Sequence, residues 1–274
     1  MHDPSQTRLG QAILNDFPRL DLDGTFQFRC GPHRECFNHC CGDVNIVLTP
    51  YDVLRMRTAL GISSGDFLDR YTIIPFSKEH TFPVVFLKMN TEEPHACPFV
   101  GDEGCTIYPD RPWACRMYPV GLAAGADDDQ GRFFFVFQEQ TCLGHQDGQD
   151  WTVGAWLEDQ ATEAFDSLGE EFKSITLHPF FDKGGRLDPA QMDMLFMSLY
   201  DLDRFRRFVF ESTFLERFRL TEEELSRIRE SEVELLRLGF RWLRFCLFRE
   251  PTIEVRKDTG RRAAGAKATT RRVP

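Results

Sequence analysis

The sequence predicts an α+β protein: a loop-rich cysteine-cluster unit with a small sheet and short helices, followed by a mainly helical C-terminal unit. Three observations lead to this prediction. Eight of the nine cysteines lie between Cys30 and Cys142, among short strand patterns and many turn residues. After about residue 150, apolar residues recur at helical spacing instead. Strong helix-start signals at Asp188 and Thr221 fall in this second half.

We expect four segments along the 274 residues. They are an N-terminal extension, a cysteine-cluster metal-binding domain, a helical region and a basic tail, at 1–25, 26–145, 146–250 and 251–274. Residues 255–274 carry a net charge of +6 and are rich in Ala, Thr and Gly, so we expect this tail to be disordered. It would be either a solvated end or an arm for an acidic partner. The remaining chain carries −16, which argues against nucleic acid as the main partner.

The first half has patterns of short strands and short helices. Runs of β-branched, aromatic and other apolar residues predict strands at 44–48, 83–89 and 132–137. Thr49 and Pro50 predict the start of a helix that ends near Leu60, before Gly61. A second short helix is expected from Ser63 or Ser64 to Tyr71, and a hairpin turn in the Gly- and Asp-rich segment 125–131.

The second half reads as amphipathic helices. Apolar residues from Val153 to Phe172 fall on one helical face. Asp188, followed by Pro189, predicts a capped helix that continues to Val209. Thr221 and Glu224 form a second capping box, which predicts a helix running to about Phe248.

The chain has no targeting pattern that we can identify. No stretch of 18 or more apolar residues exists, so we expect no membrane span. The first six residues have neither a basic start nor an apolar run, unlike a secretory signal. We therefore expect a cytoplasmic protein. In that reducing compartment, clustered thiols point to metal or redox chemistry more than to disulfides.

The cysteine pattern predicts a thiolate metal site. Four thiolates are the usual complement of a zinc site or an iron–sulfur cluster, and eight make two sets of four. The metal ligands that we predict are Cys30, Cys36, Cys40, Cys41, Cys97, Cys105, Cys115 and Cys142. Adjacent residues in an extended segment point to opposite sides, so Cys40 and Cys41 would not easily bind one metal ion together. They serve different centres, or one of them bridges or stays free, and the number of centres, one or two, is open. The alternative without metal is a set of buried or disulfide-bonded cysteines.

Other residues near the cysteines are weaker candidates. Histidines within a few residues of a cysteine are interpreted as surface or supporting side chains, with His145 the best placed as an alternative ligand; they are His33, His39, His95 and His145. Arg116 would either balance thiolate charge or form a structural salt bridge. Cys246 shares a helical face with Leu235 and Trp242, so it is predicted to be a small core residue.

An ordered string of motifs resembles a known family. It includes Cys97-Pro98-Phe99, Cys105-x-Ile107-Tyr108 and Arg111-Pro112-x-x-Cys115-Arg116-x-Tyr118-Pro119. Together with the first four cysteines, these residues are similar to the YkgJ-type cysteine-cluster proteins, called the putative zinc- or iron-chelating domain, over about residues 26–120. The family usually spaces its first cluster as CxxCxxCC, whereas here the two intervals are five and three residues. This departure leaves open whether Cys30 binds the same centre as the other three.

The resemblance implies metal chelation and no particular reaction. A more distant resemblance, to the flagellin lysine N-methylase, implies an iron–sulfur centre. That resemblance and Pro98 directly after Cys97 favour iron–sulfur over zinc, although a set of cysteines suits both.

Three functions follow as hypotheses. The first is a redox or cluster-carrying protein, the second a zinc-stapled module that binds an unknown protein partner, and the third a protein-modifying enzyme such as a lysine N-methylase. No GxGxxG, P-loop, HExxH or GxSxG motif is present, so no catalytic or cofactor-binding residue is assigned. Whether the protein is an enzyme is therefore not decided by the sequence.

Overall fold

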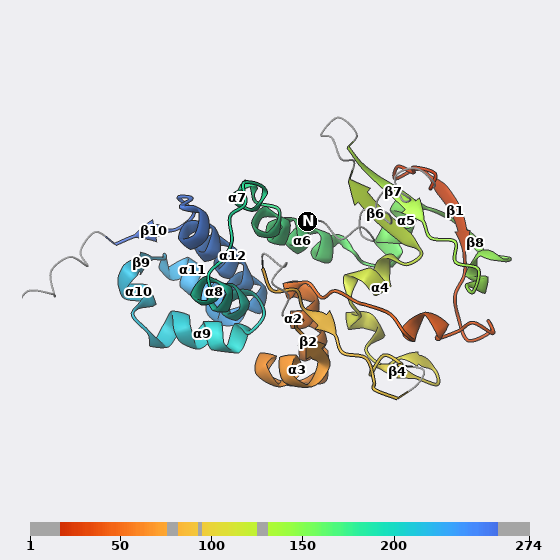
Figure 1. Cartoon of the computed structure of the whole chain (residues 1–274), viewed down its shortest axis with the longest axis horizontal. Helices are drawn as coiled ribbons and strands as arrows, with labels where there is room; N and C mark the ends of the chain where they lie inside the picture. Colours follow the sequence, from red (N-terminus) through yellow and green to blue (C-terminus); the bar gives the residue numbers. More distant parts are fainter. Residues whose placement is uncertain (1–16, 76–81, 93–94, 125–130, 257–274) are drawn as a thin grey trace, which may run out of the picture. The chain divides into compact units, whose positions relative to one another are not determined.

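The computed structural model describes residues 17–75, 82–92, 95–124 and 131–256, and it divides the chain into two compact units. The first unit comprises residues 1–174 and the second residues 175–274 (Figure 1). The first mixes small sheets with short helices and the second is mainly helical, so the expected α+β class is confirmed. Most of the expected N-terminal extension and of the basic tail lies outside the described residues.

The sheets of the first unit are all antiparallel pairs of strands. They are β1 Thr25–Phe28 with β8 Gln149–Thr152, β2 Thr72–Ile73 with β3 Phe86–Leu87, β4 Val100–Gly101 with β5 Gly104–Cys105, and β6 Val120–Ala124 with β7 Arg132–Val136. The strand expected at 132–137 is confirmed as β7, whereas residues 125–130 of the expected turn lie outside the described residues. The strand expected at 83–89 shrinks to β3, and that at 44–48 becomes an isolated bridge between Val47 and Phe86.

The helices of the first unit begin and end at recognisable caps. They are α2 Pro50–Leu60, α3 Ser64–Tyr71, α4 Trp113–Met117, α5 Val153–Asp159 and α6 Glu163–Thr176, which reaches into the second unit. Thr49 and Asp52 cap each other at the start of α2, and Gly61 ends it in the left-handed region at φ 64°. Ser63 caps α3. These two helices are therefore where the sequence predicts them.

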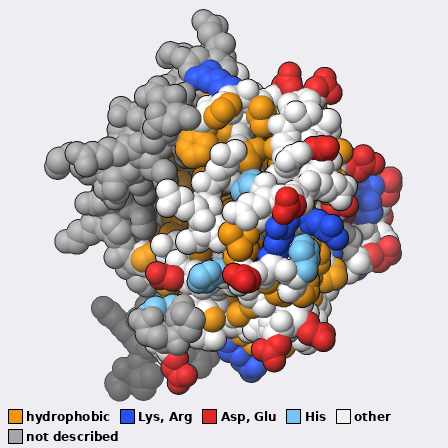
Figure 2. All heavy atoms as spheres, turned by 90° about the vertical axis from the view of Figure 1, so that its right-hand side faces the viewer, with side chains coloured by type: hydrophobic (Ala, Val, Ile, Leu, Met, Phe, Trp, Pro, Cys, Tyr) orange, Lys and Arg blue, Asp and Glu red, His pale blue; other side chains and the backbone are white. Residues whose placement is uncertain are grey.

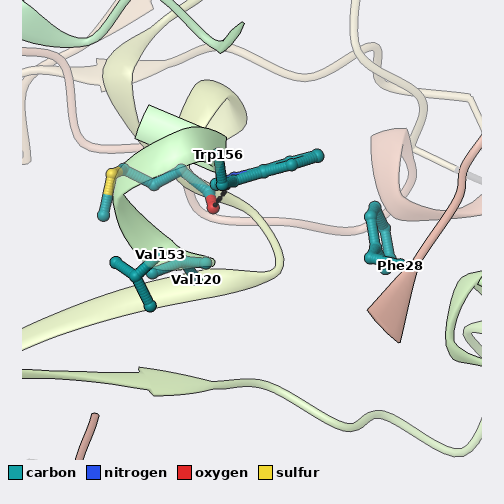
Figure 3. Close-up of a cluster of buried hydrophobic side chains, with 5 residues drawn as sticks. Phe28, Val120, Val153 and Trp156 are labelled. Atoms are coloured by element: carbon teal, nitrogen blue, oxygen red, sulfur yellow. Dashed lines mark hydrogen bonds between the residues drawn. The ribbon is translucent and has the colours of Figure 1, made fainter. Parts of the chain in front are cut away.

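One apolar cluster ties four elements of the first unit together. It comprises Phe28, Met117, Val120, Val153 and Trp156, from β1, α4, β6 and α5 (Figure 3). The Phe28 ring contacts those of Trp156 and Tyr118 edge-on, at 5.6 and 5.9 Å between centroids. Burying such side chains stabilises the fold by about 1.5–3 kcal/mol each. The cluster therefore anchors β1 immediately before the first cysteine.

The second unit packs its helices around buried leucines and aromatic rings. Its helices are α7 Pro179–Asp182, α8 Pro189–Leu199, α9 Leu202–Glu211, α10 Phe214–Arg217, α11 Glu222–Glu230 and α12 Glu232–Phe248, and β9 Phe218–Arg219 pairs with β10 Glu254–Val255. A Cβ atom at Gly239 would lie 2.4 Å from the carbonyl oxygen of Ser198, so glycine allows α12 to approach α8.

Three helices expected to be continuous are interrupted. Ala161, at φ 50°, separates α5 from α6. Asp201 caps a new helix after α8 ends, and Ser231 does the same between α11 and α12. Apolar residues keep their helical spacing across each break, so periodicity alone does not reveal it. Among the described residues, no helix is both long and apolar enough to cross a membrane.

Candidate metal centre

The segment that carries the first four cysteines is a run of tight turns. Main-chain hydrogen bonds of 3.0 Å close the turns Gly31–Arg34 and Cys36–His39. The run ends in a 3-10 helix, η1 His39–Cys41, after Asn38 in the left-handed region at φ 68°. The Asn38 side-chain amide donates to the carbonyl oxygen of Gly101 at 2.9 Å, which fixes the run to the β4–β5 hairpin. Turns thus hold these cysteines close together without a long strand or helix.

The segment that carries Cys142 lies against this run. The main-chain N–H of Leu143 donates to the sulfur of Cys36 at 3.3 Å. The N–H of Arg29 donates to the carbonyl oxygen of Gly144 at 2.8 Å. Two residues adjacent to cysteines, Leu143 and Arg29, thus join the two segments. These contacts place the Cys142 segment beside the segment that carries the first four cysteines.

Two glycines let this segment come close to β1. A Cβ atom at Gly144 would lie 2.5 Å from the ring of Phe28, and one at Gly148 would lie 2.5 Å from the Phe28 main-chain nitrogen. Real Cβ contacts are not this short, so any larger residue would push the Cys142 segment away from β1. The two glycines are therefore part of the scaffold of the site.

A second contact region joins Cys41 to the β4–β5 hairpin. The main-chain N–H of Cys97 donates to the carbonyl oxygen of Cys41 at 2.7 Å. The carbonyl oxygen of Cys97 in turn accepts from Val100 at 3.1 Å, and Val100 is the strand partner of Cys105. Cys97 and Cys105 therefore frame one hairpin, with Cys41 beside it.

Cys115 lies on the short helix α4, which a buried aspartate holds in place. The Asp52 side chain is 1% exposed, and one of its oxygens accepts from the main-chain N–H of Trp113 at 2.7 Å. Its other oxygen accepts from the main-chain N–H and the hydroxyl of Thr49, both at 2.7 Å. Burial raises the pKa of Asp52, against these hydrogen bonds, which lower it. One carboxylate thus connects the start of α2 to the helix that carries Cys115.

Arg116 is a scaffold residue. It is buried, and its guanidinium donates to the carbonyl oxygens of Gln160 at 2.8 Å, Arg111 at 3.1 Å and Pro109. Its charged carbon lies 4.4 Å from the centre of the Phe165 ring. Arg116 was expected either to balance thiolate charge or to form a structural salt bridge. These contacts agree with a structural role, in which the partners are carbonyl oxygens and a ring.

The thiols influence one another's pKa values. Burial raises the pKa of Cys30, and the thiols of Cys40, Cys142 and Cys36 raise it further. Burial also raises the pKa of Cys115 to about 12, and the thiols of Cys97, Cys105 and Cys40 raise it further.

Cys40 and Cys41 act strongly on each other. A hydrogen bond between their side chains is the largest cause that raises the pKa of Cys40, and the same bond lowers the pKa of Cys41. The other thiols that act on Cys41 are Cys97, Cys115 and Cys105. Burial favours the neutral form of a thiol, which is why it raises the pKa values of Cys30 and Cys115.

Three buried polar atoms without a hydrogen-bond partner among the described residues are found at this site. They are the Tyr118 hydroxyl oxygen, Nε2 of His145 and Nε of Arg34. Burial raises the pKa of the Tyr118 hydroxyl, and the neighbouring Cys142 thiol raises it further. His145 lies three residues after Cys142, and Arg34 lies two residues before Cys36. The Tyr118 hydroxyl and Nε of Arg34 are donors, and a negatively charged thiolate centre would satisfy them.

All nine cysteines lie within the described residues, and each is a free thiol. Cys30, Cys40 and Cys115 are exposed, although protein atoms around Cys115 are close enough to raise its pKa. The face that contains β1 and β8 has histidine side chains near its middle, with acidic and basic side chains close to them (Figure 2). Cys246 lies on α12 in the second unit, half-buried, and burial alone raises its pKa. The alternative of disulfide-bonded cysteines is not what the structure contains.

The sulfurs do not form a finished coordination site. Among the described residues, no group of three or more His, Cys, Asp or Glu side chains has the arrangement that holds a metal ion. The donor set of soft thiols and the buried donors without partners both fit a thiolate-bound metal or cluster.

Some residues of the site were not predicted. Tyr118 belongs to the motif that contains Cys115, and Asp52 belongs to the capping box of α2. Nothing in the sequence indicates that either residue contacts the site. Glu139, which raises the pKa of Cys40, was also missed. Of the four histidines, His145 is the one whose buried nitrogen lacks a partner among the described residues, and its other ring nitrogen lies 3.2 Å from the carbonyl oxygen of Gln27.

Comparison with known proteins agrees with the cysteine pattern. Searches among curated proteins and among solved structures find no match. The model of one protein family does match, over residues 29–143, which include all eight of the clustered cysteines. The resemblance inferred from the motifs is therefore confirmed: residues 29–143 match the CxxCxxCC family, described as "Putative zinc- or iron-chelating domain".

Proposed function

We propose that residues 29–143 hold iron–sulfur centres through cysteine thiolates, and that the protein serves a redox or cluster-carrying role in the cytoplasm. The observation that carries this proposal is that hydrogen bonds join segments that carry free thiols, the Cys142 segment to Cys36 and Cys97 to Cys41. Turns and main-chain hydrogen bonds hold these segments together, as in the 2.7 Å bond between Cys97 and Cys41.

The surroundings of the thiols favour a negatively charged centre. The N–H of Leu143 already donates to the sulfur of Cys36 at 3.3 Å, and hydrogen bonds to sulfur tune the potential of iron–sulfur clusters. The buried Tyr118 hydroxyl lies near the Cys142 thiol and has no hydrogen-bond partner among the described residues that would compete for it. Donors of this kind stabilise thiolate charge, whether the centre contains iron or zinc.

The exposure of the thiols favours an iron–sulfur centre over a zinc ion that only stabilises the fold. Exposed Cys30 and Cys40 would leave a centre near solvent, as electron transfer or cluster delivery requires. A zinc site that serves folding alone is usually closed. The zinc-stapled interaction module is therefore the second candidate. No contact of the described residues favours a protein-modifying enzyme.

Anaerobic purification of the full chain tests the proposal. Iron, sulfide and zinc are quantified, and the visible absorption spectrum is recorded before and after reduction with dithionite. We expect a brown protein with iron and acid-labile sulfide, and a charge-transfer band that bleaches on reduction. A colourless protein that contains zinc would favour the interaction module, and a protein without metal would contradict both.

A further inference from the structure

Arg34 joins two segments of the cysteine site through its side chain. We propose that its guanidinium positions residues 142–148, the Cys142 segment, against the turns that carry Cys30 and Cys36. The inference rests on the proposed thiolate function and adds a positioning residue on which the assembly of that site depends.

The Cys142 segment has few hydrogen bonds of its own. It contains one short 3-10 helix, η4 Leu143–His145, which the main-chain N–H of Gln146 closes by donating to the carbonyl oxygen of Leu143 at 3.1 Å. Asp147 follows in the left-handed region at φ 51°, where the helix has already ended. Carbonyl oxygens at the end of a helix have no partner within it. The segment therefore needs donors from elsewhere in the chain.

Arg34 supplies these donors from the turn that ends two residues before Cys36. Its Nη2 donates to the carbonyl oxygen of Gln146 and, at 3.3 Å, to that of Asp147. Its Nε is buried, so the side chain is held within the protein and is not a solvated cation. Arginine can hydrogen-bond the last carbonyl oxygens of a helix, and its planar head loses little freedom for each bond that it makes. Arg34 thus caps the end of η4 from a separate segment.

The main-chain contacts of the Cys142 segment depend on where η4 lies. The N–H of Leu143 donates to the sulfur of Cys36 at 3.3 Å, and the N–H of Arg29 donates to the carbonyl oxygen of Gly144 at 2.8 Å. Both contacts involve residues of η4, the helix that Arg34 caps. A movement at the end of η4 would therefore disturb the hydrogen bond to the Cys36 sulfur.

Arg29 offers a matched comparison, because it has the same charge and also lies beside the first cysteines. Arg29 directly precedes Cys30, and Arg34 lies two residues before Cys36. The Arg29 side chain is exposed and has no hydrogen bond or ion pair to another described residue. A difference between the two arginines therefore reports the hydrogen bonds of Arg34 and not the positive charge near the thiols.

Hydrogen exchange and metal content of the anaerobically purified full chain test this role. In Arg34→Gln, exchange of the main-chain N–H groups at 142–148 should rise roughly tenfold to hundredfold, because hydrogen bonds to a charged group are lost. Metal per chain should fall in the same variant. Arg29→Gln should match wild type in both measurements. Arg34→Lys, which keeps the charge on a shorter side chain, should restore only part of the protection. The N–H of Cys97, which donates to Cys41, should remain protected in every variant.

Several outcomes would overturn the positioning role. Unchanged exchange at 142–148 in Arg34→Gln is one, and unchanged metal content despite faster exchange is another. An equal effect in Arg29→Gln, or full recovery in Arg34→Lys, would assign the effect to charge alone. Loss of protection at Cys97 as well would indicate general destabilisation. A wild-type chain without metal would instead contradict the proposed function, while the exchange comparison would still decide whether Arg34 holds the Cys142 segment.

Discussion

The two units of this protein hold their shape in different ways. In the second unit, capped helices bury leucines and aromatic rings; Leu235, Leu236 and Leu243 on α12 are fully buried. In the cysteine-bearing part of the first unit, strands such as β4 and β5 have only two residues each, and turns replace longer elements. A hydrophobic core therefore accounts for the second unit, whereas the cysteine segments depend on main-chain hydrogen bonds and, as we propose, on metal.

The largest effect that we expect is from metal removal. Chelation and reduction of the full chain should unfold the cysteine segments, because binding free energy at a structural metal site is folding free energy. Hydrogen exchange followed by mass spectrometry should then show lost protection at residues 29–60 and 95–145, with α8 and α12 unchanged. Equal loss of protection in both units would contradict a dependence on metal that is confined to the cysteine segments.

Core substitutions in the two units provide the next test. Phe28→Ala, beside the first cysteines, and Leu235→Ala, in α12, remove side chains that are 3% and 0% exposed. We expect destabilisation of about 3–5 kcal/mol for the first and about 2–5 kcal/mol for the second. Urea denaturation measures both values.

Metal content then separates the two variants. Phe28→Ala should lower the metal bound per folded chain, because Phe28 packs against Gly144 in the Cys142 segment. Leu235→Ala should leave it unchanged. Equal metal loss in the two variants would show that the second unit also supports the site.

A smaller effect is expected from the buried aspartate of the first unit. Asp52→Asn places an amide donor near the N–H and hydroxyl of Thr49, so a hydrogen bond is lost at a cost of about 1–3 kcal/mol. The matched control is Asp66→Asn at the equivalent cap position of α3, which is solvent-exposed. Differential scanning calorimetry should show a clear decrease in Tm for Asp52→Asn, and little change for the control. Similar shifts in both would mean that the link from Asp52 to α4 contributes little.

The smallest effect concerns a helix cap in the second unit. Hydrogen bonding to the main-chain N–H of Thr221, and then to Arg241, holds the pKa of Glu224 below its ordinary value. Since the folded-state pKa is below the unfolded one, this stabilisation is present above the unfolded pKa and is lost as pH falls through the folded pKa. Glu224→Gln should therefore cost about 0.5–1 kcal/mol at pH 7, and the difference from wild type should shrink below about pH 4.5.

Urea denaturation over a pH series measures this difference. Glu223→Gln, at an exposed position that pairs with Arg227 one turn later, is the control and should change stability less. A difference between Glu224→Gln and wild type that does not depend on pH would contradict the role of the charge.

The local elements were largely predictable from sequence. The caps Thr49, Ser63, Asp188 and Thr221 each start a helix where expected, because capping depends on residues within three positions of one another. The breaks at Ala161, Asp201 and Ser231 were not predicted. Their neighbours keep apolar spacing on one face, and only packing against other helices selects the interruption.

For the site, the sequence by itself determined the cluster of eight cysteines and its match to the CxxCxxCC family model over residues 29–143, with the adjacent pair Cys40 and Cys41 raising the question of one centre or two. The tertiary structure decided which segments meet, since Cys97 contacts Cys41 and the Cys142 segment contacts Cys36. Neither contact is visible in the spacing, because more than 50 residues separate Cys41 from Cys97 and more than 100 separate Cys36 from Cys142. Their encounter depends on where β1, α4 and the β4–β5 hairpin pack, which is a property of the whole fold.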